Sequence, residues 1–189
     1  MSGPPILTFG TVNQFQLMYS DKGSGADLDG CFYRGVVSGD TTFLLGDYAQ
    51  GNYNPPSGSV LTVSVQNDDP TNPALAAPTG YALIWTDQGS GADMDGSLWM
   101  PIAPQGYVAL GAVSQTGYNS PYIPNLRCIR FDLVKQGLIG SLIWSDEGSG
   151  ADLDVSCYAT SSPGLFYAQG NYNPPVGPVW VPSQLVSNS

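Results

Sequence analysis

Short runs in which apolar and polar residues alternate recur along the whole chain, and turn residues separate them. The runs are rich in β-branched and aromatic residues, which is typical of β-strands. No window of helical length carries an apolar period of 3.6 residues. The pattern therefore predicts an all-β fold.

The runs form three groups of four, in the same order each time. The first runs, which end in an aromatic residue, are 15–19, 82–85 and 141–144. The second runs are 31–33, 97–100 and 156–158, and the third runs are 42–46, 106–111 and 164–168. The fourth runs are 60–65, 127–134 and 176–181. We expect a single domain over residues 1–189, made of three repeats at about 1–69, 78–134 and 135–189.

Each repeat is too small to form a core alone. A lone four-stranded sheet leaves an apolar face exposed, whereas three sheets around one axis can each bury a face. We therefore expect a β-prism of three four-stranded antiparallel sheets with internal pseudo-threefold symmetry. A three-bladed propeller or a trefoil barrel is the alternative.

The motif Asp-x-Gly-Ser-Gly-Ala-Asp-x-Asp follows the first run of every repeat, at residues 21–29, 87–95 and 146–154. Three carboxylates held within nine residues repel one another unless a cation or several N–H groups compensate them. Flexible carboxylates and carbonyls suit calcium, and magnesium fits less well because it needs near-octahedral geometry. We expect up to three Ca²⁺ sites. The predicted ligands are Asp21, Asp27, Asp29, Asp87, Asp93, Asp95, Asp146, Asp152 and Asp154. The alternative is that the aspartates only cap backbone N–H groups in tight hairpins.

A second motif, a turn of Tyr-Asn with a nearby proline, follows the third run of each repeat, at 53–55, 118–121 and 172–174. Exposed tyrosine can stack on a sugar or lie in a membrane interface, and the alternative is a tyrosine packed on its own proline. The predicted ligand-binding residues are Tyr53, Asn54, Tyr118, Asn119, Tyr172 and Asn173. For the aromatic residues that end the first runs, Tyr19, Trp85 and Trp144, we expect core packing instead.

Composition excludes several function classes. The chain has no histidine, which removes Ser-His-Asp and Cys-His hydrolysis and histidine-based metal sites. Its net charge is −10 with only five Lys and Arg, so it has no basic patch for nucleic acid. The same acidic cluster in three places argues against catalysis, since an enzyme needs one active site. Cys31, Cys128 and Cys157 predict buried reduced thiols, with a Cys31–Cys157 bridge as the alternative.

The second repeat resembles the vacuolar protein sorting-associated protein 62-related family. The resemblance lies in Trp85-Thr86-Asp87, the Gly89–Asp93 stretch, Trp99, Pro101, Gly106-Tyr107, Leu110-Gly111 and Arg127-Cys128. It implies a β-prism of the kind seen in vitelline-membrane outer-layer proteins and in targeting domains of some perforin-like toxins. The first and third repeats depart from the pattern, with Gly39-Asp40 and Ser161-Ser162-Pro163 in place of the Pro-x-Gly-Tyr approach.

From these observations we expect a non-enzymatic, calcium-binding, lectin-like module that recognises carbohydrate or glycosylated surfaces. The alternatives are a calcium-dependent lipid- or membrane-targeting domain and a purely structural protein. The expected partners are a glycan or glycoconjugate or a membrane lipid, and no nucleic acid. The N-terminus lacks a basic start and an apolar segment, and no apolar run reaches membrane-spanning length. We therefore expect a cytoplasmic protein, or one released without a signal peptide.

Overall fold

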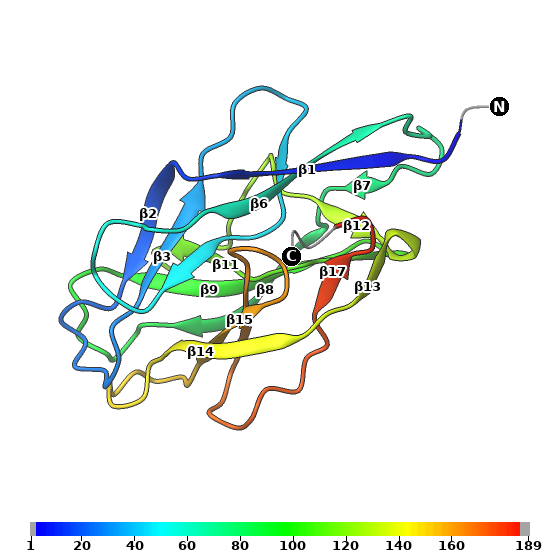
Figure 1. Ribbon diagram of the computed structural model, residues 1–189. Coiled ribbons are helices and arrows are strands. Elements are labelled where there is room, and N and C mark those ends of the chain that lie inside the picture. The colour runs from blue at the N-terminus through cyan, green and yellow to red at the C-terminus, as the bar shows by residue number, and fades with distance from the viewer. Residues whose placement is uncertain (1–2, 186–189) are drawn as a thin grey trace.

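The computed structural model describes residues 3–185 and is built from short antiparallel strands (Figure 1). Within this range the only helical segment is the single 3-10 turn η1 (Phe131–Leu133). The all-β prediction is confirmed. No helix of the described residues is long and apolar enough to span a membrane.

Three sheets carry the acidic loops, and we call them the tip sheets. Each consists of three antiparallel strands, and the strand formed by the second run lies in the middle. The first tip sheet is β2 (Phe15–Ser20), β3 (Cys31–Gly35) and β5 (Tyr48–Gln50); the second is β8 (Gly80–Thr86), β9 (Gly96–Ile102) and β11 (Val113–Thr116); the third is β14 (Ile139–Ser145), β15 (Ser156–Thr160) and β16 (Phe166–Gln169).

Three further sheets, the base sheets, pair the opening strand of a repeat with its last strand. The first base sheet is β1 (Ile6–Val12), β6 (Val60–Gln66) and β4 (Phe43–Leu44); the second is β7 (Leu75–Ala76), β12 (Cys128–Arg130) and β10 (Tyr107–Val108); the third is β13 (Val134–Gln136) and β17 (Trp180–Pro182). The first pairing is fully in register, from Ile6 opposite Gln66 to Val12 opposite Val60.

The prediction of four-stranded sheets was wrong, because the strands of each repeat divide between a tip sheet and a base sheet. In the first repeat, Phe43 and Leu44 pair with β6, whereas Tyr48–Gln50 pair with β3. Between them lies Asp47, which is buried and forms an ion pair of 3.1 Å with Arg34. The chain therefore passes from one sheet to the other at Asp47, whose buried carboxylate is neutralised by Arg34.

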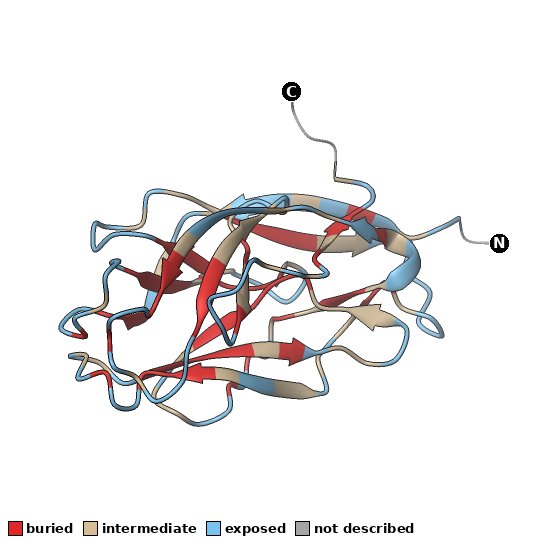
Figure 2. Cartoon of the chain, turned by 90° about the horizontal axis from the view of Figure 1, so that it is seen from below, coloured by how far each residue is buried: buried red, intermediate tan, exposed pale blue. Residues whose placement is uncertain are grey.

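The buried apolar residues form two clusters, a tip core and a larger base core that also includes Tyr33 and Trp99 of the tip sheets. Aliphatic residues dominate the base core, with Leu44, Val63 and Ile129 fully buried. The tip core is aromatic. Its central residues, Trp85 and Trp144, lie edge to face with ring centres 5.4 Å apart. Buried residues concentrate in the strands and exposed residues in the connecting loops (Figure 2).

The aromatic residues that end the first runs belong to this tip core. Tyr19, Trp85 and Trp144 are each fully buried, which confirms their expected packing role. The cysteines are also buried, and all three are free thiols, so the alternative Cys31–Cys157 bridge is not formed. Burial raises the pKa of the Cys128 thiol to about 12.

Candidate functional site

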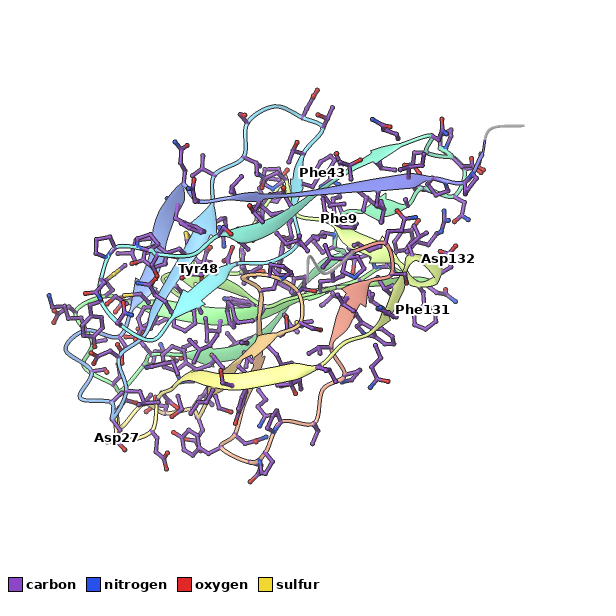
Figure 3. All side chains as sticks on the ribbon, in the orientation of Figure 1. Phe9, Asp27, Phe43, Tyr48, Phe131 and Asp132 are labelled. Atoms are coloured by element: carbon purple, nitrogen blue, oxygen red, sulfur yellow. The ribbon has the colours of Figure 1, made fainter. Side chains whose placement is uncertain are left out.

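The three acidic loops lie together at one end of the molecule, which we call the tip. They connect β2 to β3, β8 to β9 and β14 to β15, and all three connections reach the left end of the view in Figure 1. Asp27, from the first loop, marks this end in Figure 3. Each loop begins with the same tight turn, in which the serine N–H donates to the carbonyl of the first aspartate at 2.8 or 2.9 Å.

The first aspartate of each motif is buried, not presented to solvent. Asp21 is 1% exposed, and its carboxylate accepts four hydrogen bonds. Oδ1 accepts the Gly30 N–H at 2.9 Å and the Tyr53 hydroxyl at 2.7 Å. Oδ2 accepts the Ser24 hydroxyl at 3.3 Å and the Trp144 indole N–H at 3.0 Å. A carboxylate has about four acceptor sites, so Asp21 has none left for a metal ion.

The third loop repeats this arrangement. Asp146 Oδ1 accepts the Val155 N–H and the Tyr172 hydroxyl, both at 2.8 Å. Oδ2 accepts the Trp85 indole N–H at 2.9 Å and the Ser149 hydroxyl at 3.5 Å. Two motifs 125 positions apart (146 − 21) thus use the same four kinds of donor.

The second loop repeats the backbone N–H and serine donors but not the indole. Asp87 Oδ1 accepts the Gly96 N–H at 2.8 Å, and Oδ2 accepts the Ser90 hydroxyl at 3.3 Å. A tyrosine, Tyr19, stands where the other two repeats have tryptophan. Its hydroxyl is the one buried side-chain polar atom of the described residues that has no hydrogen-bond partner. Burial raises the pKa of Tyr19, and the nearby charge of Asp87 raises it further.

These indole bonds link the repeats to one another. Trp144 of the third repeat donates to Asp21 of the first, and Trp85 of the second donates to Asp146 of the third. The loop backbones are linked in a closed cycle. The second aspartate of each motif donates its N–H to a carbonyl of another loop: Asp27 to Glu147, Asp93 to Lys22, and Asp152 to Gln88, each at 2.8 Å. The tip is therefore one interlocked structure, not three independent hairpins.

The Tyr-Asn turns lie against the same aspartates. The Tyr172 hydroxyl lies between two carboxylates of its own repeat, 2.8 Å from Asp146 and 3.2 Å from Asp154. Burial raises the pKa of Tyr172, and the hydrogen bond to Asp146 adds to the effect. The pKa values of Tyr53 and Tyr118 are raised by the same two causes, with Asp21 and Asp87 as the respective partners.

The hydroxyl groups of Tyr53 and Tyr172 are hydrogen-bonded to aspartates, but the two side chains remain partly exposed to solvent. Tyr53 is 39% exposed and Tyr172 is 40% exposed. The alternative, in which the tyrosine only packs on its proline, does not include the hydroxyl bonds of Tyr53 and Tyr172 to aspartates. Asn54 and Asn173 are exposed, and their N–H groups are held at 3.0 Å by the side chains of Asn52 and Asn171. Tyr118 is half-buried and Asn119 is exposed. The six predicted ligand-binding residues therefore surround the tip, beside the acidic loops.

The remaining aspartates are not buried, namely Asp27, Asp29, Asp93, Asp95, Asp152 and Asp154. The side chain of Asp93 lies so close to Gly23 of the neighbouring loop that a Cβ there would collide with it. Within residues 3–185, no group of three or more acidic or cysteine side chains is arranged to hold a metal ion. In the first and third motifs an ion held by all three carboxylates does not fit, because Asp21 and Asp146 are buried and each already accepts four hydrogen bonds.

Sequence reasoning missed the bonds between repeats. The recurring tryptophan two residues before the motif was a signal for them, because a buried indole N–H needs an acceptor. Nothing in the spacing indicates that the acceptor belongs to another repeat.

The fold and tip define an all-β module whose three repeats are joined through buried aspartates. The chain belongs to the family described as vacuolar protein sorting-associated protein 62, whose model matches residues 6–165. This confirms the resemblance carried by the acidic motifs. Among solved structures, the chain is similar to GNIP1Aa from Chromobacterium piscinae, with 30% identity and a TM-score of 0.77. The similarity covers 90% of this chain and 34% of that protein. No curated protein matches the chain in sequence.

Proposed function

We propose that the protein is a non-enzymatic recognition module that binds carbohydrate at its tip. The observation that carries the proposal is the set of tyrosine rings whose hydroxyls are fixed by buried aspartates while their faces stay partly open. Tyr53 and Tyr172 are the clearest cases, at 39% and 40% exposed. Fixing a ring before the ligand arrives reduces the entropy lost on binding.

The groups around each ring suit a sugar. Asp154 lies 3.2 Å from the Tyr172 hydroxyl and is itself exposed, so its carboxylate can accept hydrogen bonds from sugar hydroxyls. Asn173 is also exposed and brings an amide with both donor and acceptor atoms. An aromatic face beside such groups is the composition of a carbohydrate subsite.

The absence of catalysis is part of the proposal. The chain contains no histidine, and the first aspartate of each motif already accepts hydrogen bonds from several protein donors. A carboxylate in this state is a poor general base, since its acceptor sites are occupied. Three recurring sites favour multivalent binding, which raises avidity by about 10²–10⁴ where the geometry permits.

Calcium binding stays a prediction, in a narrower form. An ion at the first or third loop would use the second and third aspartates together with backbone carbonyls, because Asp21 and Asp146 already accept four hydrogen bonds each. Calcium would then bridge the tip to sugar hydroxyls or to an anionic surface. Magnesium, which requires stricter geometry, remains the weaker candidate.

A calcium-dependent membrane-targeting domain is the second candidate. The observation in its favour is that Leu28 and Leu153, between the aspartates of their loops, are 40% and 42% exposed. Aliphatic side chains at a tip can enter a lipid interface, and cations would be needed to offset the carboxylates. Flotation with phosphatidylserine vesicles in the presence of calcium tests this reading. Equal flotation with neutral vesicles and with EDTA would contradict it.

A glycan array probed with and without calcium tests the carbohydrate proposal. The matched proteins are the wild type, a triple tyrosine-to-alanine variant at positions 53, 118 and 172, and the corresponding phenylalanine variant. Phenylalanine keeps the stacking face and loses only the hydroxyl. We expect binding by the wild type, weaker binding by the phenylalanine variant and none by the alanine variant. If the folded wild type binds no glycan in either condition, the proposal fails.

A further inference from the structure

A groove away from the tip is lined by two arginines. It lies between the segment before β4 in the first repeat and the segment before β12 in the second, and its volume is about 530 Å³. Arg34 and Arg127 both line it, which places two of the five basic residues of an acidic protein in one groove. Phe43, also in its lining, lies far from Asp27 of the tip in Figure 3.

The two arginines differ in whether their guanidinium groups are ion-paired. Arg34 is committed to the fold, because its guanidinium forms two hydrogen bonds with the buried Asp47, at 3.2 and 3.1 Å. Arg127 forms no ion pair among the described residues. Only its Nη1 donates, to the carbonyl oxygens of Pro124 at 2.9 Å and Leu126 at 2.8 Å. The edge formed by Nε and Nη2 has no partner in the described part of the chain.

Arg127 is nevertheless held in place. Its guanidinium lies over the ring of Phe43, 4.2 Å from the ring centre. Stacking and the two carbonyl bonds fix the orientation of the group, and its free edge is the one that binds a carboxylate through two parallel hydrogen bonds. A fixed, unpaired guanidinium edge in a groove is suited to an anionic ligand.

The other groups of the groove indicate more than an anion. Tyr122 is 85% exposed, so its ring is open to a ligand in the groove. Asn125 and Asp40 complete the relevant lining, with an amide and a carboxylate. Asp40 can accept hydrogen bonds from hydroxyls, and its charge disfavours a doubly charged phosphate more than a singly charged carboxylate. The lining therefore combines a carboxylate receptor, a stacking face and hydroxyl acceptors.

We propose that this groove binds an acidic sugar residue, with the Arg127 guanidinium on the sugar carboxylate and the Tyr122 ring on the sugar face. Uronic and sialic acid residues of glycans belong to this chemical class. The inference rests on the proposed carbohydrate-binding function, and it adds a second site, distinct from the tip, that selects for acidic glycans.

The test uses two sugars that differ only at one carbon, methyl glucuronide and methyl glucoside, titrated into the ¹⁵N-labelled full chain. The readouts are the Arg127 Nε–Hε signal, assigned by its loss in Arg127→Gln, and the fitted affinity. We expect the glucuronide to shift this signal and to bind at least about tenfold more tightly than the glucoside, as charge-assisted hydrogen bonds are strong.

Three variants separate binding from folding. Arg127→Gln is expected to weaken glucuronide binding by about tenfold or more, and Tyr122→Ala by several-fold. Tyr122 is nearly free of the protein, so its replacement leaves the fold intact. Arg130→Gln is the matched control, because Arg130 is paired with Asp132 outside the groove, and glucuronide affinity should not change.

The outcomes distinguish the two proposals. Unchanged glucuronide affinity in Arg127→Gln overturns the groove site. Acetate or inorganic phosphate binding as tightly as glucuronide overturns the sugar assignment and leaves only an anion site. Neither result affects the tip, whose neutral-glycan binding is read from Tyr172→Ala. Failure of the wild type to bind neutral glycans, with intact glucuronide binding, would contradict the proposed tip function alone.

Discussion

The indole N–H of Trp85 donates to Asp146, 61 positions along the chain, at 2.9 Å. Both residues are buried, and they belong to different repeats. The same contact joins Trp144 to Asp21 at 3.0 Å. A motif that resembles a cation-binding loop thus uses its first carboxylate to join one repeat to another.

Replacing Trp85 with phenylalanine tests the importance of this contact for stability. The variant leaves Asp146 without one of its four donors and opens space in the tip core. We expect a loss of about 2–4 kcal/mol in the free energy of unfolding. Denaturant unfolding followed by circular dichroism measures it. A loss below about 0.5 kcal/mol, the usual range of surface substitutions, would show that the bond contributes little.

Tyr19 provides the matched comparison at the equivalent position of the first repeat. Its buried hydroxyl has no partner among the described residues, so Tyr19→Phe removes an unsatisfied polar group and no hydrogen bond. The expected change is within about 0.5 kcal/mol, or a slight gain in stability. The same unfolding measurement applies. A loss as large as that of Trp85→Phe would indicate a hydrogen bond from Tyr19 in solution.

Alkaline pH is expected to destabilise the protein. Burial and aspartate partners raise the pKa values of Tyr53, Tyr118 and Tyr172 above the usual value of 10.0. Well below pH 10 all are protonated in both states, and the stabilisation is complete. Above it, the unfolded chain releases protons that the folded chain keeps, so stability falls as pH rises.

Tyrosinate absorbance followed together with circular dichroism across this range checks the pH effect. We expect part of the tyrosine signal to appear only as the fold is lost. Tyr172→Phe serves as the control and should reduce that late fraction. Complete ionisation of the tyrosines in the folded protein would contradict the hydrogen bonds at the tip.

The effect of metal ions on stability distinguishes the structural role of the first aspartates from the proposed calcium binding by the second and third. We expect EDTA to leave the melting temperature unchanged, because protein donors satisfy the first aspartates. Calcium is expected to raise the melting temperature in a saturable way, by a stabilisation of about 1.4 kcal/mol at ten times Kd. Asp93→Asn should blunt the rise. If calcium has no effect on the wild type, the second and third aspartates do not bind it.

Much of the fold could be predicted from the sequence, because an alternating pattern identifies a strand locally. The first and second runs of every repeat became paired strands, such as β8 with β9. The sheet assignment could not be predicted. Phe43–Leu44 pair with β6, and the buried Asp47–Arg34 ion pair that follows them in the fold is not visible in the pattern of apolar residues.

The candidate site was predictable in location but not in its bonding. The motif spacing identified three equivalent loops, and the turns identified Tyr53 and Tyr172. That Tyr53 donates to Asp21, 32 positions earlier, follows only from the folded arrangement. Calcium ligation by all three aspartates of a motif was a reasonable interpretation of local charge, yet the donors that satisfy Asp21 include residues from distant parts of the chain.

The most direct test of the account is the stoichiometry of a neutral glycan at the tip, measured by isothermal titration calorimetry. The best neutral ligand from the array would be titrated into the wild type and into Tyr53→Ala, Tyr118→Ala and Tyr172→Ala separately. If each repeat presents one tyrosine-centred site, the wild type should bind three equivalents and each single variant two. An unchanged stoichiometry and affinity in all three variants would show that the tyrosine faces of the tip are not the binding sites.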